Sequence, residues 1–375
     1  MGRNIGGGYY GMKNYGDDLF GTVSMLAARE YWINEHFCLM CPPLKGLEAD
    51  YAVPKWFPEN IYGSLNTVGK ASRLGLLLKS LKQADRYIFC GGSVFSSSAS
   101  GTRDILARFN QRGLALSAIG VSIGPFLDVA SEKAIKALLQ RFEYVALRDH
   151  ASYEIAKSFG LECPIVLAGD LAGLMPRYFP KMEKHDRSKT CTNKMIAFSP
   201  CNMPESPAKS LSYCIDFIKA IVSVKESLSL KVILLNLNGH AVLGDRVLCE
   251  YTQQRLQEEY GVESKIVNYS DAGILGIWNI ISELDLYISV RLHGAISAFH
   301  LNVPFSLVEY HPKCSGFLND INKRAALRLE EGAERLADII LEHFGNREDL
   351  SDMAHQSSNA AILNFSRAPW MNSGR

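Results

Sequence analysis

Several features that would place a protein in a special class are missing from this sequence. No uninterrupted apolar run approaches the ~20 residues of a membrane-spanning helix, and the opening MGRNIGGGYY has no apolar core of signal-peptide length. The formal net charge is only +1, which gives no argument for a nucleic-acid partner. We therefore expect a cytoplasmic protein whose preference for any anion comes from the local placement of its side chains.

The spacing of the cysteines predicts neither a disulfide framework nor a metal site. The chain has 9 scattered cysteines, an odd number that fits a reducing compartment. Cys38 and Cys41 form a single CxxC without a second pair, so we interpret them as structural and expect no bound metal.

The usual glycine-rich nucleotide-binding motifs are not found in the glycine-rich stretch GYYGMKNYGDDLF. It is not a Walker loop, because no GK[ST] follows, and it contains no GxGxxG.

A length of 375 residues exceeds what one hydrophobic core usually supports, so two domains are expected. Both halves repeat a short apolar strand, a glycine-rich or charged turn and a helix. This alternation predicts an α/β fold with two Rossmann-like domains facing a cleft, as in GT-B proteins. We place an N-terminal domain at 1–180, a polar linker at 181–194 and a C-terminal domain at 195–348. The tail at 349–375 could pack back on the N-terminal domain.

The most informative stretch is 287–313, YISVRLHGAISAFHLNVPFSLVEYHPK, which predicts a strand, a helix over 295–301 and a second strand. Arg291 and His293 follow the first strand, and in extended geometry side chains two apart share a face. Gly294 would allow a tight turn or a close approach to a ligand. A single Arg or His is more often an ion-pair partner or a core residue, but the pair beside a helix N-terminus favours an anionic ligand.

Other candidate residues also stand at predicted strand ends, where open α/β sheets bind ligands. Arg148 could bind a ligand or pair with its neighbour Asp149. Lys313 follows the last predicted strand. Gly92 belongs to GGSVFSSSAS, a loop that could bind a polar ligand through its serines or could have no function.

The loop that starts at Gly8 precedes a helix predicted over 17–31 and has backbone amides placed to hold a phosphate or carboxylate. Asn14 lies within it. Asp17 is equally compatible with a first-turn acid of the helix and with a catalytic carboxylate. Tyr9 and Tyr10 could stack on a sugar ring or pack against the protein.

Five segments, taken together, resemble the polysaccharide pyruvyl transferase family: GYYGMKNYGDDL, CGGSVF, AIGVSIGPF, VALRDHAS and SVRLHGAISAFHLNVPFSLVEYHPK. The resemblance implies a GT-B-like fold and transfer of the enolpyruvyl part of phosphoenolpyruvate to two hydroxyls of a sugar, which yields a cyclic pyruvate ketal and phosphate. It implies neither a cofactor nor a nucleotide-sugar donor. Arg291 and His293 match the RLH motif of the family, Arg148 matches its RD turn, and Lys313 matches by position.

The implied reaction suggests roles for these residues. The phosphate and carboxylate of phosphoenolpyruvate require fixed cations. The candidates for substrate binding are Arg148, Arg291, Lys313, Gly92 and Asn14.

The implied reaction also requires proton transfer. We expect His293 to be the main proton-transfer group, because imidazole titrates near neutrality, and Asp17 to be the weaker candidate for the base. Replacing Arg291 or His293 by Ala should abolish turnover without loss of the fold. The expected partners are phosphoenolpyruvate and a sugar or oligosaccharide acceptor from exopolysaccharide or cell-wall glycan synthesis. If that acceptor is lipid-linked, the protein would work at the inner face of the membrane.

Two other functions stay open. A GT-B nucleotide-sugar glycosyltransferase would use Arg291 and Lys313 to hold a diphosphate and would bind UDP- or GDP-sugars. A non-catalytic glycan- or anion-binding regulator would bind phosphoenolpyruvate, if at all, without releasing phosphate. The presence of His293 beside the cations favours an enzyme.

Overall fold

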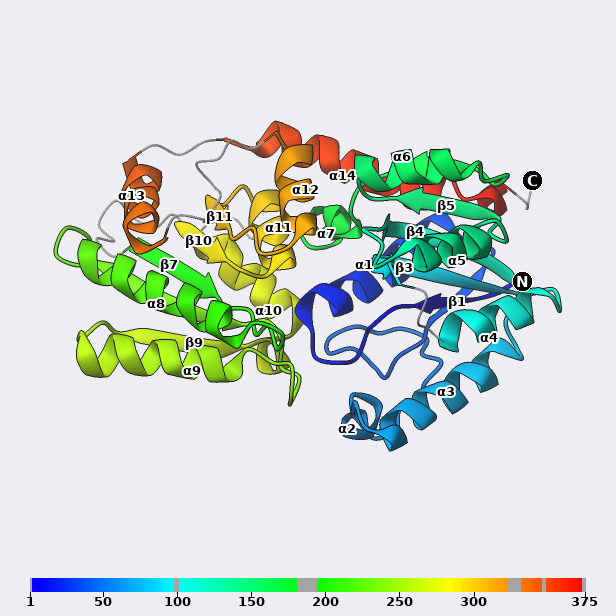
Figure 1. Ribbon diagram of the computed structural model, residues 1–375, viewed down its shortest axis with the longest axis horizontal. Coiled ribbons are helices and arrows are strands. Elements are labelled where there is room, and N and C mark those ends of the chain that lie inside the picture. The colour runs from blue at the N-terminus through cyan, green and yellow to red at the C-terminus, as the bar shows by residue number, and fades with distance from the viewer. Residues whose placement is uncertain (1, 98–100, 181–193, 323–331, 346–348, 373–375) are drawn as a thin grey trace. The chain divides into compact units, whose positions relative to one another are not determined.

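The computed structural model describes residues 2–97, 101–180, 194–322, 332–345 and 349–372 (Figure 1). Contacts within the chain divide it into two units. The N-terminal unit comprises Met1–Met12, Asp17–Tyr178 and Gln356–Arg375, and the C-terminal unit comprises Lys13–Gly16 and Phe179–His355. Each unit is built on one parallel β-sheet with helices, so the predicted class of two parallel-sheet α/β domains is confirmed. Most of the predicted linker, 181–193, lies outside the described residues.

The sheet of the N-terminal unit has six described strands in the order β2-β1-β3-β4-β5-β6, all parallel. The strands are β1 (Arg3–Gly7), β2 (His36–Leu39), β3 (Arg86–Phe95), β4 (Ala115–Ile123), β5 (Tyr144–Leu147) and β6 (Ile165–Leu167). The helices before the linker are α1 (Tyr15–Tyr31), α2 (Glu59–Tyr62), α3 (Thr67–Leu81), α4 (Gly101–Asn110), α5 (Val129–Leu139), α6 (His150–Phe159) and α7 (Met175–Tyr178).

The glycine-rich strand β1 lies inside this sheet, between β2 and β3. A side chain at Gly6 would overlap the ring of Phe37 on β2, and one at Gly7 would overlap the hydroxyl of Tyr87 on β3. The glycines therefore make room for aromatic rings of the neighbouring strands, which explains why a central strand has so few apolar side chains of its own.

The C-terminal helix α14 (Ser351–Ser366) ends in the core of the N-terminal unit. Asn364 is fully buried there; its Oδ1 accepts the Gly120 N–H at 2.6 Å, and its Nδ2 donates to the Gly169 carbonyl at 2.9 Å. Trp32 donates from Nε1 to the carbonyl of Phe365 at 3.2 Å. The end of the chain thus satisfies buried backbone groups at the middle of the N-terminal sheet.

The sheet of the C-terminal unit has five described strands in the order β11-β10-β7-β8-β9, also parallel. The strands are β7 (Lys194–Ser199), β8 (Leu230–Asn236), β9 (Ser264–Asn268), β10 (Leu286–Ser289) and β11 (Phe305–Leu307). The helices are α8 (Pro207–Val224), α9 (Arg246–Gln254), α10 (Tyr269–Glu283), α11 (Leu292–His300), α12 (Pro312–Asp320) and α13 (Gly332–Gly345). None of the described helices in either unit combines the length and apolarity needed to cross a membrane.

Candidate functional site

The carboxyl ends of three neighbouring strands of the C-terminal sheet carry the candidate site. Arg291 follows β10, Cys201 follows β7, and Lys313 follows β11, and these strands are adjacent in the order β11-β10-β7. Because the strands are parallel, their carboxyl ends share one edge of the sheet, where open α/β sheets bind ligands.

Arg291 is held by a carboxylate that the sequence did not single out, that of Asp245 just before α9. Its Nε donates to Oδ2 at 2.9 Å and its Nη2 donates to Oδ1, the bidentate arrangement of a guanidinium on a carboxylate. The Asp245 side chain is 0% exposed and that of Arg291 is 18% exposed. The two N–H groups of Nη1 lie outside this pair, so the guanidinium is fixed in place while one edge can still donate to a ligand.

Burial acts on both members of this pair. It raises the pKa of Asp245 above its ordinary value, and the Arg291 guanidinium opposes this rise. Burial alone would lower the pKa of Arg291, but Asp245 outweighs it, and the pKa is raised. Asp245 also accepts the Asn202 N–H at 2.9 Å. Arg291 is therefore positively charged at any working pH, and removing it would leave a buried carboxylate unpaired, contrary to the expectation that Arg291→Ala leaves the fold intact.

Lys313 lies in the first turn of α12, after the N-cap residue His311. Its ammonium group is 5.9 Å from the ring centre of Tyr310, within the range of a cation–π contact. Arg291 and Lys313 both lower the pKa of the buried Cys201 thiol, although burial dominates and raises it. Both cations therefore act on the same thiol at the end of β7, and the anion site stays a prediction.

Helix α11 begins at Leu292, three residues before the predicted start, so Arg291 is its N-cap and His293 lies within its first turn. The expectation that Arg291 and His293 share a face of an extended strand was therefore wrong, because β10 ends at Ser289. Gly294 lies in the first turn of α11. It faces β10, where a Cβ would overlap the Tyr287 hydroxyl and lie 2.8 Å from Ser289 Oγ. Glycine at this position lets α11 pack directly on its own strand.

His293 contacts the short segment Lys13–Gly16 that belongs to the C-terminal unit. A Cβ added to Gly16 would overlap the imidazole Nδ1 and lie 2.6 Å from Cγ. Ser297 donates to the His293 carbonyl and is itself hydrogen-bonded to the Tyr15 hydroxyl, both at 2.8 Å. The imidazole thus packs on the backbone of Gly16.

The expected substrate residue Asn14 fixes this segment. Its side-chain Oδ1 accepts the Gly16 N–H at 3.1 Å, and its backbone forms an antiparallel bridge with Asn238 at the end of β8. The Tyr15 N–H donates to the Leu237 carbonyl at 2.9 Å. The observed contacts of Asn14 hold the loop that carries Gly16, and contact with a substrate stays a prediction.

The other three predicted residues belong to the N-terminal unit. Asp17 lies in the first turn of α1. Its neighbour Asp18 has a structural contact, because its Oδ1 accepts the Gly11 N–H at 2.6 Å and closes the preceding loop. Gly92 has φ +89° on β3, where the pairing with β4 shifts between Gly92 and Phe95. Glycine adopts such a backbone without strain.

Arg148 is 7% exposed and lies in a network of strand-end side chains. Its Nε donates to Ser122 Oγ at 2.6 Å, its Nη2 donates to Ser93 Oγ at 3.0 Å, and its Nη1 donates to Asp170 at 3.3 Å. Asp149 lies 3.7 Å away, so the ion pair considered from the sequence is present. These contacts connect the ends of β3, β4 and β5, and any contact with substrate would come in addition to them.

The sequence matches the family model of polysaccharide pyruvyl transferase over residues 14–312, which includes Asn14, Arg148, Arg291 and His293. The chain belongs to this family. Comparison with the curated proteins finds no match.

Solved structures that resemble this pyruvyl transferase family member support its fold. The putative UDP-N-acetylglucosamine 2-epimerase from Listeria monocytogenes has a TM-score of 0.64 and 13% identity, with 97% of this chain and 94% of that chain covered. The UDP-GlcNAc 2-epimerase from Neisseria meningitidis, bound to UDP-GlcNAc, has a TM-score of 0.55 and 11% identity, with 98% and 99% covered. Trehalose-6-phosphate synthase OtsA has a TM-score of 0.56 and 9% identity, with 99% and 97% covered. At such identities the likeness concerns the fold alone, which is of the GT-B type.

Proposed function

We propose that the protein transfers the enolpyruvyl group of phosphoenolpyruvate to two hydroxyls of a sugar and releases phosphate. The observation that carries the proposal is the placement of Arg291, Lys313 and His293 at one sheet edge, with Arg291 fixed by Asp245. Phosphoenolpyruvate is a small ligand with a phosphate and a carboxylate, and Arg291, Lys313 and the N-terminus of α11 suit such an anion. Membership of the family adds the expected class of reaction.

The reaction needs proton transfer and no redox step. An acid protonates the methylene carbon of phosphoenolpyruvate, and the electrons of the double bond form the new C–H bond. The first sugar hydroxyl adds through its oxygen to the resulting oxocarbenium-like carbon. The second hydroxyl then takes the place of phosphate on the same carbon, as the bond between this carbon and the phosphate oxygen breaks. The proton of one sugar hydroxyl returns the acid to its protonated form, and the proton of the other hydroxyl leaves with the phosphate. No cofactor is required by this balance.

Within this proposal His293 is the acid, since imidazole exchanges protons near neutral pH and His293 stands two residues after Arg291 in the first turn of α11. Asp17 is the second candidate for the base that accepts a hydroxyl proton. The acceptor is a sugar or oligosaccharide of an exopolysaccharide or cell-wall glycan. With a lipid-linked acceptor, the protein would work in the cytoplasm at the membrane surface.

A thermal-shift comparison tests the donor. Phosphoenolpyruvate should raise the melting temperature of the wild type, because a ligand that binds only the folded state stabilises it. Lys313→Met should lose this shift. The control is Lys231→Met, which removes an exposed lysine at the amino end of the same sheet. These two variants are preferable to Arg291→Ala, whose loss of stability would confuse the comparison.

Stabilisation by UDP- or GDP-sugars without stabilisation by phosphoenolpyruvate would instead support a nucleotide-sugar glycosyltransferase. His293→Gln separates enzyme from regulator. It should keep the phosphoenolpyruvate shift while phosphate release in the presence of acceptor is lost. Phosphate release equal to that of the wild type would remove His293 from the mechanism.

A further inference from the structure

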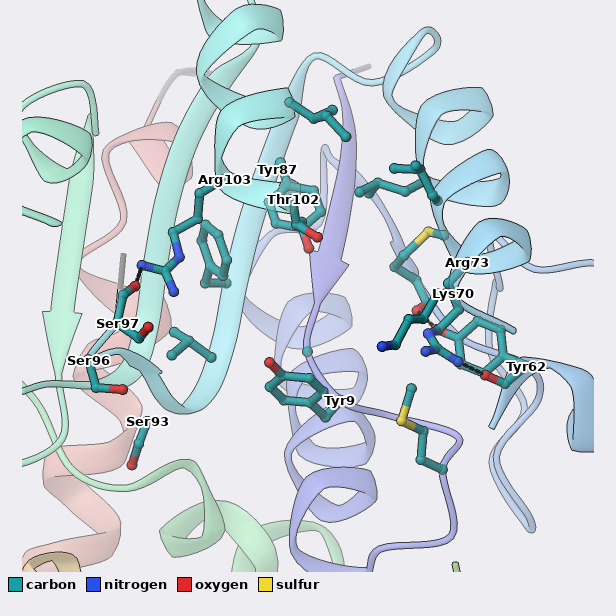
Figure 2. A pocket seen from close by; sticks show the side chains of 18 residues that line it. Tyr9, Tyr62, Lys70, Arg73, Tyr87, Ser93, Ser96, Ser97, Thr102 and Arg103 are labelled. Carbon is teal, nitrogen blue, oxygen red and sulfur yellow. Dashed lines mark hydrogen bonds between the residues drawn. The ribbon is translucent and has the colours of Figure 1, made fainter. Parts of the chain in front are cut away.

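The N-terminal unit contains a pocket that the proposed phosphoenolpyruvate site does not use. It has a volume of about 670 Å³ and lies where β1 and β3 end, between helices α3 and α4 (Figure 2). Its 18 lining residues include three cations, Lys70, Arg73 and Arg103, and no aspartate or glutamate. In a chain whose formal net charge is +1, such an imbalance around one cavity is local and indicates an anionic ligand.

Both arginines donate hydrogen bonds to backbone carbonyls, and the charge of the neighbouring Asp104 also acts on Arg103. Arg73 donates from Nη1 to the carbonyls of Tyr62 and Ser64, the latter at 2.8 Å, and Arg103 donates to the carbonyl of Ser97. Carbonyl oxygens orient a guanidinium without cancelling its charge. Burial also lowers the pKa of Arg103, which means that its charged form has lost part of its hydration. A ligand anion would restore favourable contacts for that charge.

Lys70 and Tyr9 add an adaptable cation and an aromatic surface. Lys70 is exposed on α3, and Figure 2 shows its ammonium group directed to the space beside Tyr9. Tyr9 is 64% exposed, whereas the adjacent Tyr10 is 1% exposed and donates to the carbonyls of Gly7 and Cys90. Of the two tyrosines that the sequence offered for stacking, Tyr10 packs in the core and Tyr9 lines the pocket.

Hydroxyl groups line the opposite side of the pocket. Ser93, Ser96 and Ser97 come from the end of β3 and the loop after it, and Thr102 from α4 (Figure 2). Ser93 is positioned by Arg148, which donates to its Oγ at 3.0 Å. Hydroxyls that can both donate and accept, facing an exposed aromatic ring, suit a saccharide, whose hydroxyls form hydrogen bonds and whose C–H faces pack on the ring.

We propose that this pocket binds a saccharide that carries an anionic group, either a phosphate or a carboxylate. The sugar ring packs on Tyr9, and Lys70, on the α3 side of the pocket in Figure 2, binds the anion. The volume is that of a small-molecule site and accommodates one or two sugar residues. The choice of a saccharide rests on the proposed function, since a pyruvyl transferase needs a sugar besides phosphoenolpyruvate.

Calorimetric titration tests the pocket with defined probes. N-acetylglucosamine 1-phosphate and glucuronate represent the phosphate and the carboxylate, and N-acetylglucosamine and glucose are their neutral counterparts. The wild type should bind at least one anionic probe more tightly than its counterpart. Lys70→Met should lower the affinity for that anionic probe by about tenfold, the usual effect of losing one charge-assisted hydrogen bond, and should leave the affinity for the neutral sugar unchanged. Tyr9→Ala should lower the affinity for both probes.

The matched control is Lys82→Met, which removes an exposed lysine at the C-terminal end of α3, outside the pocket lining. Equal affinity of the wild type for anionic and neutral probes would overturn the proposal, as would equal effects of Lys70→Met and Lys82→Met. So would stronger Lys70-dependent binding of UDP than of any saccharide. The phosphoenolpyruvate thermal shift should persist in Lys70→Met; its absence already in the wild type would reject the proposed function while leaving the pocket result interpretable.

Discussion

The imidazole of His293 packs so closely on Gly16 that a single methyl group at residue 16 would overlap it. Two segments separated by most of the chain therefore define the position of the candidate acid, and the hydrogen bonds of Asn14, Tyr15 and Ser297 hold both segments in place.

Gly16→Ala should move the His293 ring and lower turnover by about 100-fold, as expected for a misplaced catalytic group. The overlap should also lower the free energy of unfolding by about 1–3 kcal/mol. NMR titration of the histidine signals would show a changed His293 resonance, assigned by its loss in His293→Gln. Gly75→Ala on α3 is the control, because a Cβ there meets no atom within 4 Å. A Gly16→Ala protein with wild-type His293 signals and turnover would contradict the prediction.

Asp245→Asn should destabilise the protein by about 3–5 kcal/mol, because it leaves the Arg291 guanidinium without its buried counter-charge. Glu250→Gln gives the comparison: Glu250 is 50% exposed and pairs with the 73% exposed Arg246, so its loss should change the free energy of unfolding by less than about 1 kcal/mol. Urea unfolding of both variants measures the difference. Similar stabilities would show that the Arg291 pair is hydrated in solution.

Stability should fall at acid pH through His300. Burial lowers its pKa to about 3, while an unfolded histidine titrates near ~6.5. Between these values the unfolded chain binds a proton that the folded chain does not, so the free energy of unfolding decreases as the pH falls, by about 2 kcal/mol at about pH 5. The decrease should be smaller by this amount in His300→Gln, measured by urea unfolding at about pH 7.5 and about pH 5. His355→Gln, at an exposed position, is the control, and identical losses in both variants would refute the assignment to His300.

Asn364→Ala should destabilise the N-terminal unit by about 2–4 kcal/mol, because the buried Gly120 N–H and Gly169 carbonyl both lose their partner. Asn359→Ala on the exposed side of the same helix should have little effect. Thermal unfolding would compare them. If the two variants melt together, the end of α14 contributes little to the stability of the fold.

The strands and the type of fold were accessible from the sequence because short apolar runs ending in glycine or charge mark parallel strands. The two strands predicted within 287–313 are present as β10 and β11. By contrast, β2 and α3 were not predicted from the sequence. In β2 only four residues are extended, and α3 starts from a local Asn66 cap, so neither has a long periodic pattern.

The candidate site was only partly accessible for a different reason. Arg291, His293 and Lys313 stand at strand ends, which periodicity locates. Asp245 and Gly16 act through partners that are distant in sequence. Asp245 and Arg291 are 46 residues apart, and no local sequence pattern reveals such a pairing. Gly294 shows the converse error: its conformational freedom was the obvious property, but its small size is what the packing of α11 on β10 uses.

The membership of Lys13–Gly16 in the C-terminal unit has a consequence for exchanging parts between relatives. A chimera cut at the linker would combine the C-terminal half of one protein with residues 13–16 of another, and so would mismatch Gly16 with a foreign histidine. Grafts that carry residues 13–16 together with 194–355 should preserve this contact, so the functional exchange unit in this protein is discontinuous along the gene.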